Sequence, residues 1–373
     1  DVQADAYAFP DRFFAPRIWE IRRQRPDDAE MAEAIAALRE SKRPLILAGG
    51  GVRYSGASAE LMGFAESAGI PVATTQAGKS VMPEAHPNYV GSLGVTGSSA
   101  ANDLAQRADV VLSVGSRLQD FTTGSNGLIK GQVLALNVQL HDATKHDAMT
   151  VVGDARVGLE TLGHALVGHH TSDVYQQEYA TLKLQWDAAV DNVTKKPEGN
   201  TLPSDSAVIG AVNRNVPATA IAVGAAGSMP GELHKLWRTG AVDGYHMEYG
   251  FSCMGYEVSA GIGVHMASPN RPNVVFAGDG SYLMMNSELA TAVMIGVSMT
   301  LVVTDNRGYG CINRLQAATG GAPFNNLLAD AHHEILPEID FAAHAASLGA
   351  RSQKVLSLDE LEEAVLAASG REG

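Results

Sequence analysis

The chain has 373 residues, which is enough for two or three domains with full-sized hydrophobic cores. Its 27 basic and 41 acidic residues give a formal net charge of −14, which argues against a nucleic-acid or anionic-membrane surface. Two cysteines are too few for a disulfide framework, so we expect a reduced, cytoplasmic setting. No apolar stretch is long enough to span a bilayer and no signal-peptide pattern opens the chain, so we expect no membrane partner.

Residues 1–26 do not predict a domain of their own. Scattered aromatic and apolar side chains are followed by a basic run at 22–26. We expect an extended tail that docks on the next domain, with the basic run facing solvent. Because the chain begins with Asp1, we also expect it to be a piece of a longer protein.

A regular alternation of strands and helices begins at the helix-capping residue Asp27. Short apolar runs predict strands at 44–48, 70–74, 109–115, 133–137 and 149–152. Helical spacing of apolar residues predicts helices at 31–41, 57–68, 100–107 and 156–167. This alternation indicates a parallel sheet with helices on both faces, in a domain that spans 27–170.

Three glycines, Gly49, Gly50 and Gly51, follow the first predicted strand, where a dinucleotide-binding loop would lie. The full G-x-G-x-x-G pattern is absent because Tyr54 stands at the third glycine position. No clear ribose-binding acid follows the next strand. A structural turn is therefore the better interpretation.

Residues 171–203 predict a helix or linker, and segment 195–200 is the clearest domain break. A second alternation fills 204–373. It predicts strands at 220–223, 273–277, 299–304 and 353–356, and helices at 208–216, 229–237, 258–266, 285–295, 341–348 and 358–368. We therefore expect an α/β protein with two doubly wound parallel-sheet domains. A further strand is expected after the last helix, so the second domain is expected to be incomplete at its C-terminal end.

The most informative motif lies in this second domain. Asp279 stands between two glycines after one predicted strand, and Asn306 follows the next predicted strand. The carboxyl ends of parallel strands form the ligand-binding edge of such a sheet. A carboxylate, an amide oxygen and a glycine carbonyl, as at Gly308, form an oxygen-only set that suits magnesium. Gly280 and Ser281 could then approach a diphosphate, although Gly-Asp-Gly alone also fits a plain strand-to-helix turn.

The Gly-Asp-Gly triplet, a gap of 24 residues and a pair ending in asparagine resemble the motif of thiamine diphosphate-dependent enzymes. The resemblance implies that Asp279, Asn306 and the carbonyl of Gly308 hold Mg²⁺ and thereby thiamine diphosphate. The pair here is Asp305-Asn306 instead of two asparagines, and the liganding second position is kept. The two domains then resemble the family's central domain and its diphosphate-binding domain.

Two further loops resemble cofactor-binding loops of this family. The small-residue turn 224–228 could meet a phosphate through the amides of Gly227 and Ser228, or could be only a tight turn. In loop 245–255, Met254 occupies the position of the apolar residue that wedges between the two cofactor rings, and the carbonyl of Ser252 would accept a hydrogen bond from the aminopyrimidine. Core filling is the alternative for Met254.

Longer strings at 45–56, 230–238, 245–256 and 311–316 resemble one branch of the family. That branch opens a small, polyhydroxylated cyclic diketone by hydrolysing a carbon–carbon bond in myo-inositol breakdown. Family members are homodimers or homotetramers. The glutamate that activates the cofactor belongs to a preceding domain, of which 1–26 resembles the exit tail, so the chain alone is expected to be inactive.

No catalytic residue is therefore assigned within the chain. His246 and His234 are candidates for proton donors to the substrate, and each also has a structural interpretation. Two other functions remain open: a thiamine diphosphate enzyme acting on 2-oxo acids, of the acetolactate synthase or decarboxylase type, and a non-catalytic cofactor-binding module.

Overall fold

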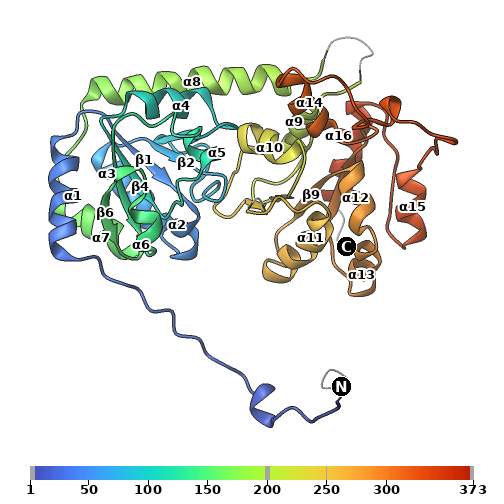
Figure 1. The fold of residues 1–373 in the computed structure, drawn as a ribbon, viewed down its shortest axis with the longest axis horizontal. Coiled ribbons are helices and arrows are strands. Elements are labelled where there is room, and N and C mark those ends of the chain that lie inside the picture. The colour runs from blue at the N-terminus through green and yellow to red at the C-terminus, as the bar shows by residue number, and fades with distance from the viewer. Residues whose placement is uncertain (1–4, 198–201, 249, 370–373) are drawn as a thin grey trace.

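Two α/β units lie side by side and are bridged along one side by the long helix α8, Asp173–Thr194 (Figure 1). The computed structural model describes residues 5–197, 202–248 and 250–369. Part of the predicted domain break, at 198–200, lies outside the described residues. Each unit contains its own parallel sheet, so the predicted fold class is confirmed.

The first unit contains a six-stranded sheet in the order β3-β2-β1-β4-β5-β6. Its strands are β1 Pro44–Ala48, β2 Val72–Thr74, β3 Tyr89–Ser92, β4 Val110–Val114, β5 Gln132–Asn137 and β6 Met149–Val152. All five neighbouring pairs are parallel. β3 was not predicted, because a run of four residues with glycine and serine shows its strand character only through pairing with β2.

Helices cover both faces of this sheet, as predicted. They are α1 Asp28–Glu40, α2 Gly50–Tyr54, α3 Ser58–Ala68, α4 Ser99–Arg107, α5 Asp120–Thr123, α6 Leu140–Ala143 and α7 Ala155–Ala165, with a 3₁₀ turn η3 at Lys145–Asp147. Side chains alternate between faces along a strand. Ile46 therefore joins the core under α1, α3 and α7, whereas Leu45 and Leu47 join the core under α4 and α8.

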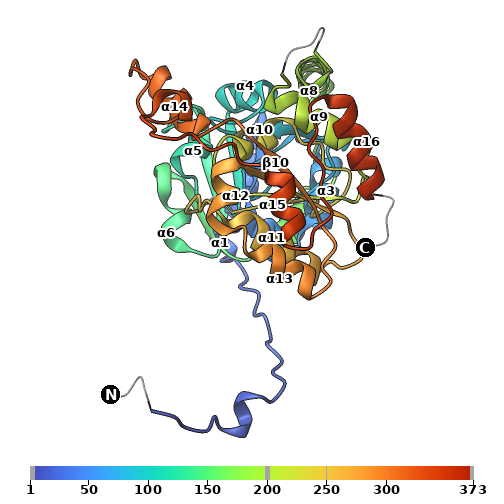
Figure 2. The same ribbon diagram turned by 90° about the vertical axis from the view of Figure 1, so that its right-hand side faces the viewer.

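The second unit contains a four-stranded parallel sheet in the order β10-β9-β7-β8. Its strands are β7 Ile221–Gly224, β8 Tyr245–Met247, β9 Asn273–Gly278 and β10 Thr300–Thr304. Its helices are α9 Asp205–Asn215, α10 Met229–Leu236, α11 Tyr256–Ala267, α12 Asp279–Met285, α13 Glu288–Met294, α14 Gly310–Ala318, α15 Phe341–Ser347 and α16 Leu358–Ser369, with a 3₁₀ turn η4 at Leu328–Asp330. α9 and α16 pack together on one face, and α11 and α13 lie on the other (Figure 2).

Two predictions in this unit were wrong, and one helix was missed. The crossover predicted as one helix at 285–295 is two helices, and the first begins at Asp279 itself. The strand predicted at 353–356 does not form, because the amide of Leu356 donates instead to Glu360 at 2.8 Å, ahead of α16. The polar stretch after the metal motif forms helix α14, which had not been predicted.

The tail runs away from both units (Figures 1 and 2). Phe9, Phe13 and Phe14, on and beside the 3₁₀ turn η2 (Asp11–Phe13), are exposed and contact one another. The tail meets the first unit at its end, where Arg23 pairs with Asp154 at 3.1 Å. The basic run is therefore not wholly solvated, contrary to prediction.

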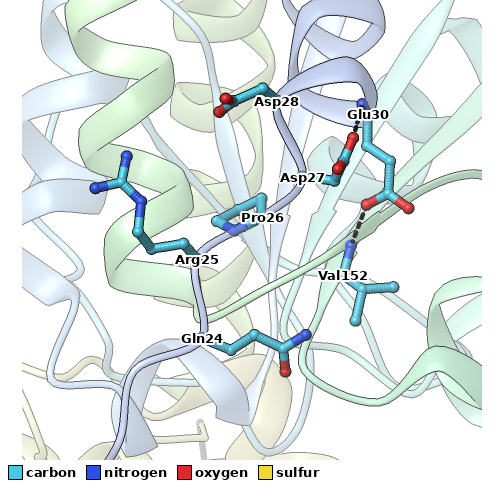
Figure 3. A pocket seen from close by; sticks show the side chains of 7 residues that line it. All are labelled: Gln24, Arg25, Pro26, Asp27, Asp28, Glu30 and Val152. Carbon is cyan, nitrogen blue, oxygen red and sulfur yellow. Dashed lines mark hydrogen bonds between the residues drawn. The ribbon is translucent and has the colours of Figure 1, made fainter.

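Beside this junction is an open hollow of about 560 Å³ (Figure 3). It is lined by Gln24, Arg25, Pro26, Asp27, Asp28, Glu30 and Val152. Glu30 accepts a hydrogen bond from the Val152 amide at 2.9 Å, which ties α1 to the end of β6. The hollow belongs to the first unit and contains none of the predicted cofactor residues.

A buried polar seam joins the two units. Lys79 and Ser92 of the first unit donate to the carbonyl of His234 in α10, at 3.0 and 3.1 Å, and Thr96 contacts its imidazole Nδ1 at 3.0 Å. Gln76 donates to the carbonyl of Pro230 and to the hydroxyl of Tyr245, both at 3.1 Å. The units are thus docked by directional hydrogen bonds, which define their orientation more narrowly than apolar contact would.

Lys79 is the most unusual member of this seam. Its side chain is 2% exposed, and its amine lies 4.0 Å from the carboxylate of Glu84, which Lys183 also approaches at 4.0 Å. Burial lowers the pKa of Lys79 and raises the pKa of Glu84, and the mutual attraction of the pair opposes both shifts. Each charge therefore depends on the other.

Replacing Lys79 with alanine should lower the free energy of unfolding by about 3–5 kcal/mol, because the buried carboxylate of Glu84 then keeps only Lys183, at 4.0 Å, as a close cation. The double variant Lys79→Met/Glu84→Gln should recover at least half of that loss. Urea denaturation measures both. Lys196→Ala removes an exposed pair with Asp359 and should cost less than about 1 kcal/mol. Equal losses in the single and double variants would contradict this account.

Candidate cofactor site

The carboxyl ends of β9 and β10 lie at the same level. The two strands pair in parallel, and Thr304, the last residue of β10, is the partner of Gly278, the last residue of β9. Asp279 then opens α12, while residues 305–308 form the loop after β10. The shared edge predicted from the sequence is therefore present.

Asp279 is buried and contacts the loop after β10 across this edge. Its Oδ2 accepts a hydrogen bond from the amide of Gly308 at 2.9 Å, whereas its Oδ1 is buried without a hydrogen-bond partner. Burial raises the pKa of Asp279, and the charge of Asp305 adds to this, although the amides of Gly308 and Gly280 oppose the shift. An inward oxygen without a partner fits a cation that the protein itself does not supply.

The glycines of this loop are required by close packing. Gly308 has a φ of +147°, and a β-carbon there would stand 2.5 Å from the carbonyl oxygen of Asn326. A β-carbon on Gly280 would stand 2.9 Å from the ring of Tyr309 and 3.4 Å from Cε of Met254. Only glycine allows the backbone to pass this closely, so the loop presents main-chain groups to the edge of the sheet.

These distances also place the predicted wedge residue. Met254 is half-buried and its methyl group lies over Gly280, so the loop after β8 and the Gly-Asp-Gly turn come together. Ser252 is exposed and has a φ of +55°, an uncommon conformation for a residue with a β-carbon. Met254 is half-buried and lies outside the hydrophobic core clusters of the described residues in this unit.

Asn306 packs against Gly310, where a β-carbon would lie 3.0 Å from its Nδ2. Gly227 has a φ of +92° and open space beside it, and Ser228 immediately precedes α10. Ser281 is buried in the first turn of α12. Among the described residues there is no group of three His, Cys, Asp or Glu side chains that could hold a metal ion.

The sequence did not reveal Glu257, which links two of these loops. It is 1% exposed, and its carboxylate accepts from the amides of Gly255 at 2.9 Å and Ala226 at 3.4 Å. The turn after β7 and the loop before α11 are therefore held to each other. An acidic residue in the first turn of an otherwise small and apolar helix was the available signal.

The two candidate histidines have different surroundings. His234 lies in the seam between the units, and burial lowers its pKa to about 3, so it is neutral and structural. His246, at the centre of β8, contacts the hydroxyl of Tyr256 at 2.9 Å. Burial and the nearby charge of Arg53 lower the pKa of His246, which favours the neutral imidazole.

Two regions of the chain match thiamine diphosphate enzymes. Residues 31–162 match the family described as thiamine pyrophosphate enzyme, central domain. Residues 225–373 match the family described as thiamine pyrophosphate enzyme, C-terminal TPP binding domain. The chain belongs to the thiamine diphosphate-dependent enzyme family.

The curated relatives reported next share one enzyme name. The chain is 38% identical to proteins named 3D-(3,5/4)-trihydroxycyclohexane-1,2-dione hydrolase from Geobacillus thermodenitrificans and Bacillus thuringiensis. The protein of that name from Clostridium tetani is 37% identical. Each match covers 98% of this chain and 62% of the relative, so the chain spans less than two thirds of their length.

Asp279→Asn should separate stability from binding. The side-chain oxygen of asparagine can still accept from the Gly308 amide, and the substitution removes a buried charge. The thermal midpoint of the metal-free protein should therefore stay level or rise. Affinity for Mg²⁺ with thiamine diphosphate should fall by about 100-fold or more. Scanning calorimetry and titration calorimetry measure the two effects. A lower midpoint with unchanged affinity would contradict the assignment.

Lowering the pH should change stability and metal affinity in the same direction as Asp279→Asn does, because both remove the charge of Asp279. Because its pKa is raised, the carboxyl takes up its proton at a higher pH than an ordinary aspartate would. Its neutral form stabilises the metal-free protein, and that contribution is present in acid and is lost as pH rises through the raised pKa. Metal affinity follows the opposite course and decreases as pH falls through the same range.

Proposed function

We propose that this chain is the cofactor-holding part of a thiamine diphosphate- and Mg²⁺-dependent hydrolase that opens a small polyhydroxylated cyclic diketone at a carbon–carbon bond. The observation that carries the cofactor assignment is the buried, unpartnered Oδ1 of Asp279 beside the Gly308 turn. The substrate class rests on the curated relatives at 37–38% identity.

The residues at the sheet edge have distinct roles in this proposal. Asp279, the side chain of Asn306 and the carbonyl of Gly308 hold Mg²⁺, while the amides around Gly227, Ser228, Gly280 and Ser281 bind the diphosphate. Met254 sets the angle between the rings, and the carbonyl of Ser252 orients the aminopyrimidine. Bound thiamine diphosphate supplies a nucleophilic carbon and an electron sink. The chain contributes position and charge.

The proposal assigns activation of the cofactor to a glutamate supplied by a further domain. Glu248 does not take that role, because both of its carboxylate oxygens already accept from backbone amides within its own loop. We therefore expect the chain alone to bind cofactor weakly and to show no turnover. Weak calorimetric binding that is abolished by Asp279→Ala supports the site, whereas turnover by the isolated chain contradicts it.

An interface with another copy or domain would suit one surface of the second unit. Met284, Met294, Ile312 and Leu315 on α12–α14, and Ile295 directly after α13, are exposed, and α14 buries none of its residues. Among the described residues there is no helix with the length and hydropathy needed to cross a bilayer. We propose a homodimer or homotetramer as the assembled form.

Substrate choice can be tested on the whole protein. Trihydroxycyclohexanedione should be opened to an acidic product, measured by base uptake at constant pH, with pyruvate consumed at least 100-fold more slowly. Pyruvate tests the alternative enzyme class, because an acetolactate synthase or decarboxylase would use the same cofactor edge. Faster pyruvate consumption would replace the proposed substrate, and cofactor binding without either reaction would favour a non-catalytic module.

His246 is the proposed proton-transfer residue for the substrate; because its lowered pKa favours the neutral imidazole, it would take up a proton before donating one. It is half-buried beside the wedge loop, and its contact with Tyr256 orients the ring. His246→Gln should lower kcat by about 10²–10⁴-fold with little change in cofactor affinity. Tyr256→Phe keeps the imidazole and should lower kcat less. Unchanged turnover in His246→Gln would remove this residue from the mechanism.

A further inference from the structure

The loop that presents Ser252 and Met254 is supported by side chains rather than by a sheet. Residues 250–255 lie between β8 and α11 and carry the atoms assigned to the aminopyrimidine and to the ring wedge. Glu257 anchors the end of the loop through the amide of Gly255, at 2.9 Å. The part before that anchor is exposed: Phe251 has 90% of its surface accessible, and Ser252 and Cys253 are exposed as well.

Glu248 brackets this exposed part. Its Oε1 accepts from the amide of Phe251 and its Oε2 from the amide of Cys253, both at 2.9 Å. These amides flank Ser252 on either side, and Ser252 is the residue with the unfavourable φ of +55°. A carboxylate that binds both neighbours of a left-handed residue offsets the tendency of that residue to relax.

From this arrangement we propose that Glu248 is a positioning residue that holds Ser252 in its left-handed conformation and so aims the Ser252 carbonyl and Met254 at the cofactor. Both carboxylate oxygens are occupied by amides, so Glu248 acts through the loop and transfers no proton. The first unit approaches the same turn, because a β-carbon on Gly250 would stand 4.0 Å from Nη2 of Arg117 as well as 3.5 Å from Oε1 of Glu248. The link to the cofactor rests on the proposed function, whereas the support of the loop does not.

Two readouts test the proposal. Chymotrypsin cleavage after the exposed Phe251 reports on loop order without any cofactor. Glu248→Ala should raise the rate of that cleavage and weaken thiamine diphosphate–Mg²⁺ binding, each by roughly tenfold. Glu248→Gln should be intermediate, since its amide oxygen can accept from one backbone amide but its NH₂ group cannot accept from the other.

Rescue by a second substitution separates positioning from general stability. Glycine adopts a positive φ without a steric penalty. Ser252→Gly in the Glu248→Ala background should therefore reverse a large part of both effects, the faster cleavage and the weaker binding. Glu360→Ala is the matched control, because Glu360 also accepts from a backbone amide, that of Leu356 at 2.8 Å, ahead of α16 on the opposite face of the sheet. It should change neither readout.

The outcomes distinguish this proposal from the proposed function. Wild-type cleavage rates in Glu248→Ala, or faster cleavage and weaker binding that Ser252→Gly does not reverse, would overturn the positioning role. Faster cleavage that Ser252→Gly reverses, in a protein that binds no thiamine diphosphate, would support the role of Glu248 in the loop and contradict the cofactor assignment instead. Faster cleavage accompanied by weaker binding, both rescued, supports the two together.

Discussion

The hydrogen bond from the Gly308 amide to Asp279 is the contact on which the candidate site depends. It joins the ends of β9 and β10, and it leaves one carboxylate oxygen buried without a partner. A protein seldom tolerates such an oxygen without a use, since desolvation of a charge is costly. The raised pKa of Asp279 expresses that cost, and a cation at the same position would remove it.

Close backbone packing makes this contact geometrically specific. Gly308 passes beside Asn326, Gly280 passes beneath Tyr309 and Met254, and side chains at either glycine would collide with these neighbours. The Gly-Asp-Gly turn after β9 and the loop before α11 are thereby placed against each other. Glu257 extends the same organisation to the turn after β7, so the segments that follow all four strands of this sheet, β7 to β10, meet at one edge.

The seam between the two units has a different physical character. It is polar, it includes the buried Lys79–Glu84 pair, and its members come from the β2–β3 region, from α10 and from β8. Buried polar contacts contribute little net free energy when satisfied and are costly when broken. They therefore define how the first unit faces the cofactor edge, even though the cores on either side supply most of the stability.

Local pattern in the sequence was sufficient for the alternation of strands and helices, for the two parallel sheets, and for the spacing that brings Asp279 and residues 305–308 to one edge. Strand hydrophobicity and helix periodicity act over a few residues, so they can be read without the fold. The same local reasoning missed β3 and β8, which are short and are defined by their pairing, and it predicted a strand at 353–356 that became the capping segment of α16. Only the tertiary structure decided the roles of Glu248, Glu257 and Lys79. Each of these side chains acts through a hydrogen bond to a backbone group or a contact between units, and such contacts exist only once the loops and the two sheets have been placed together.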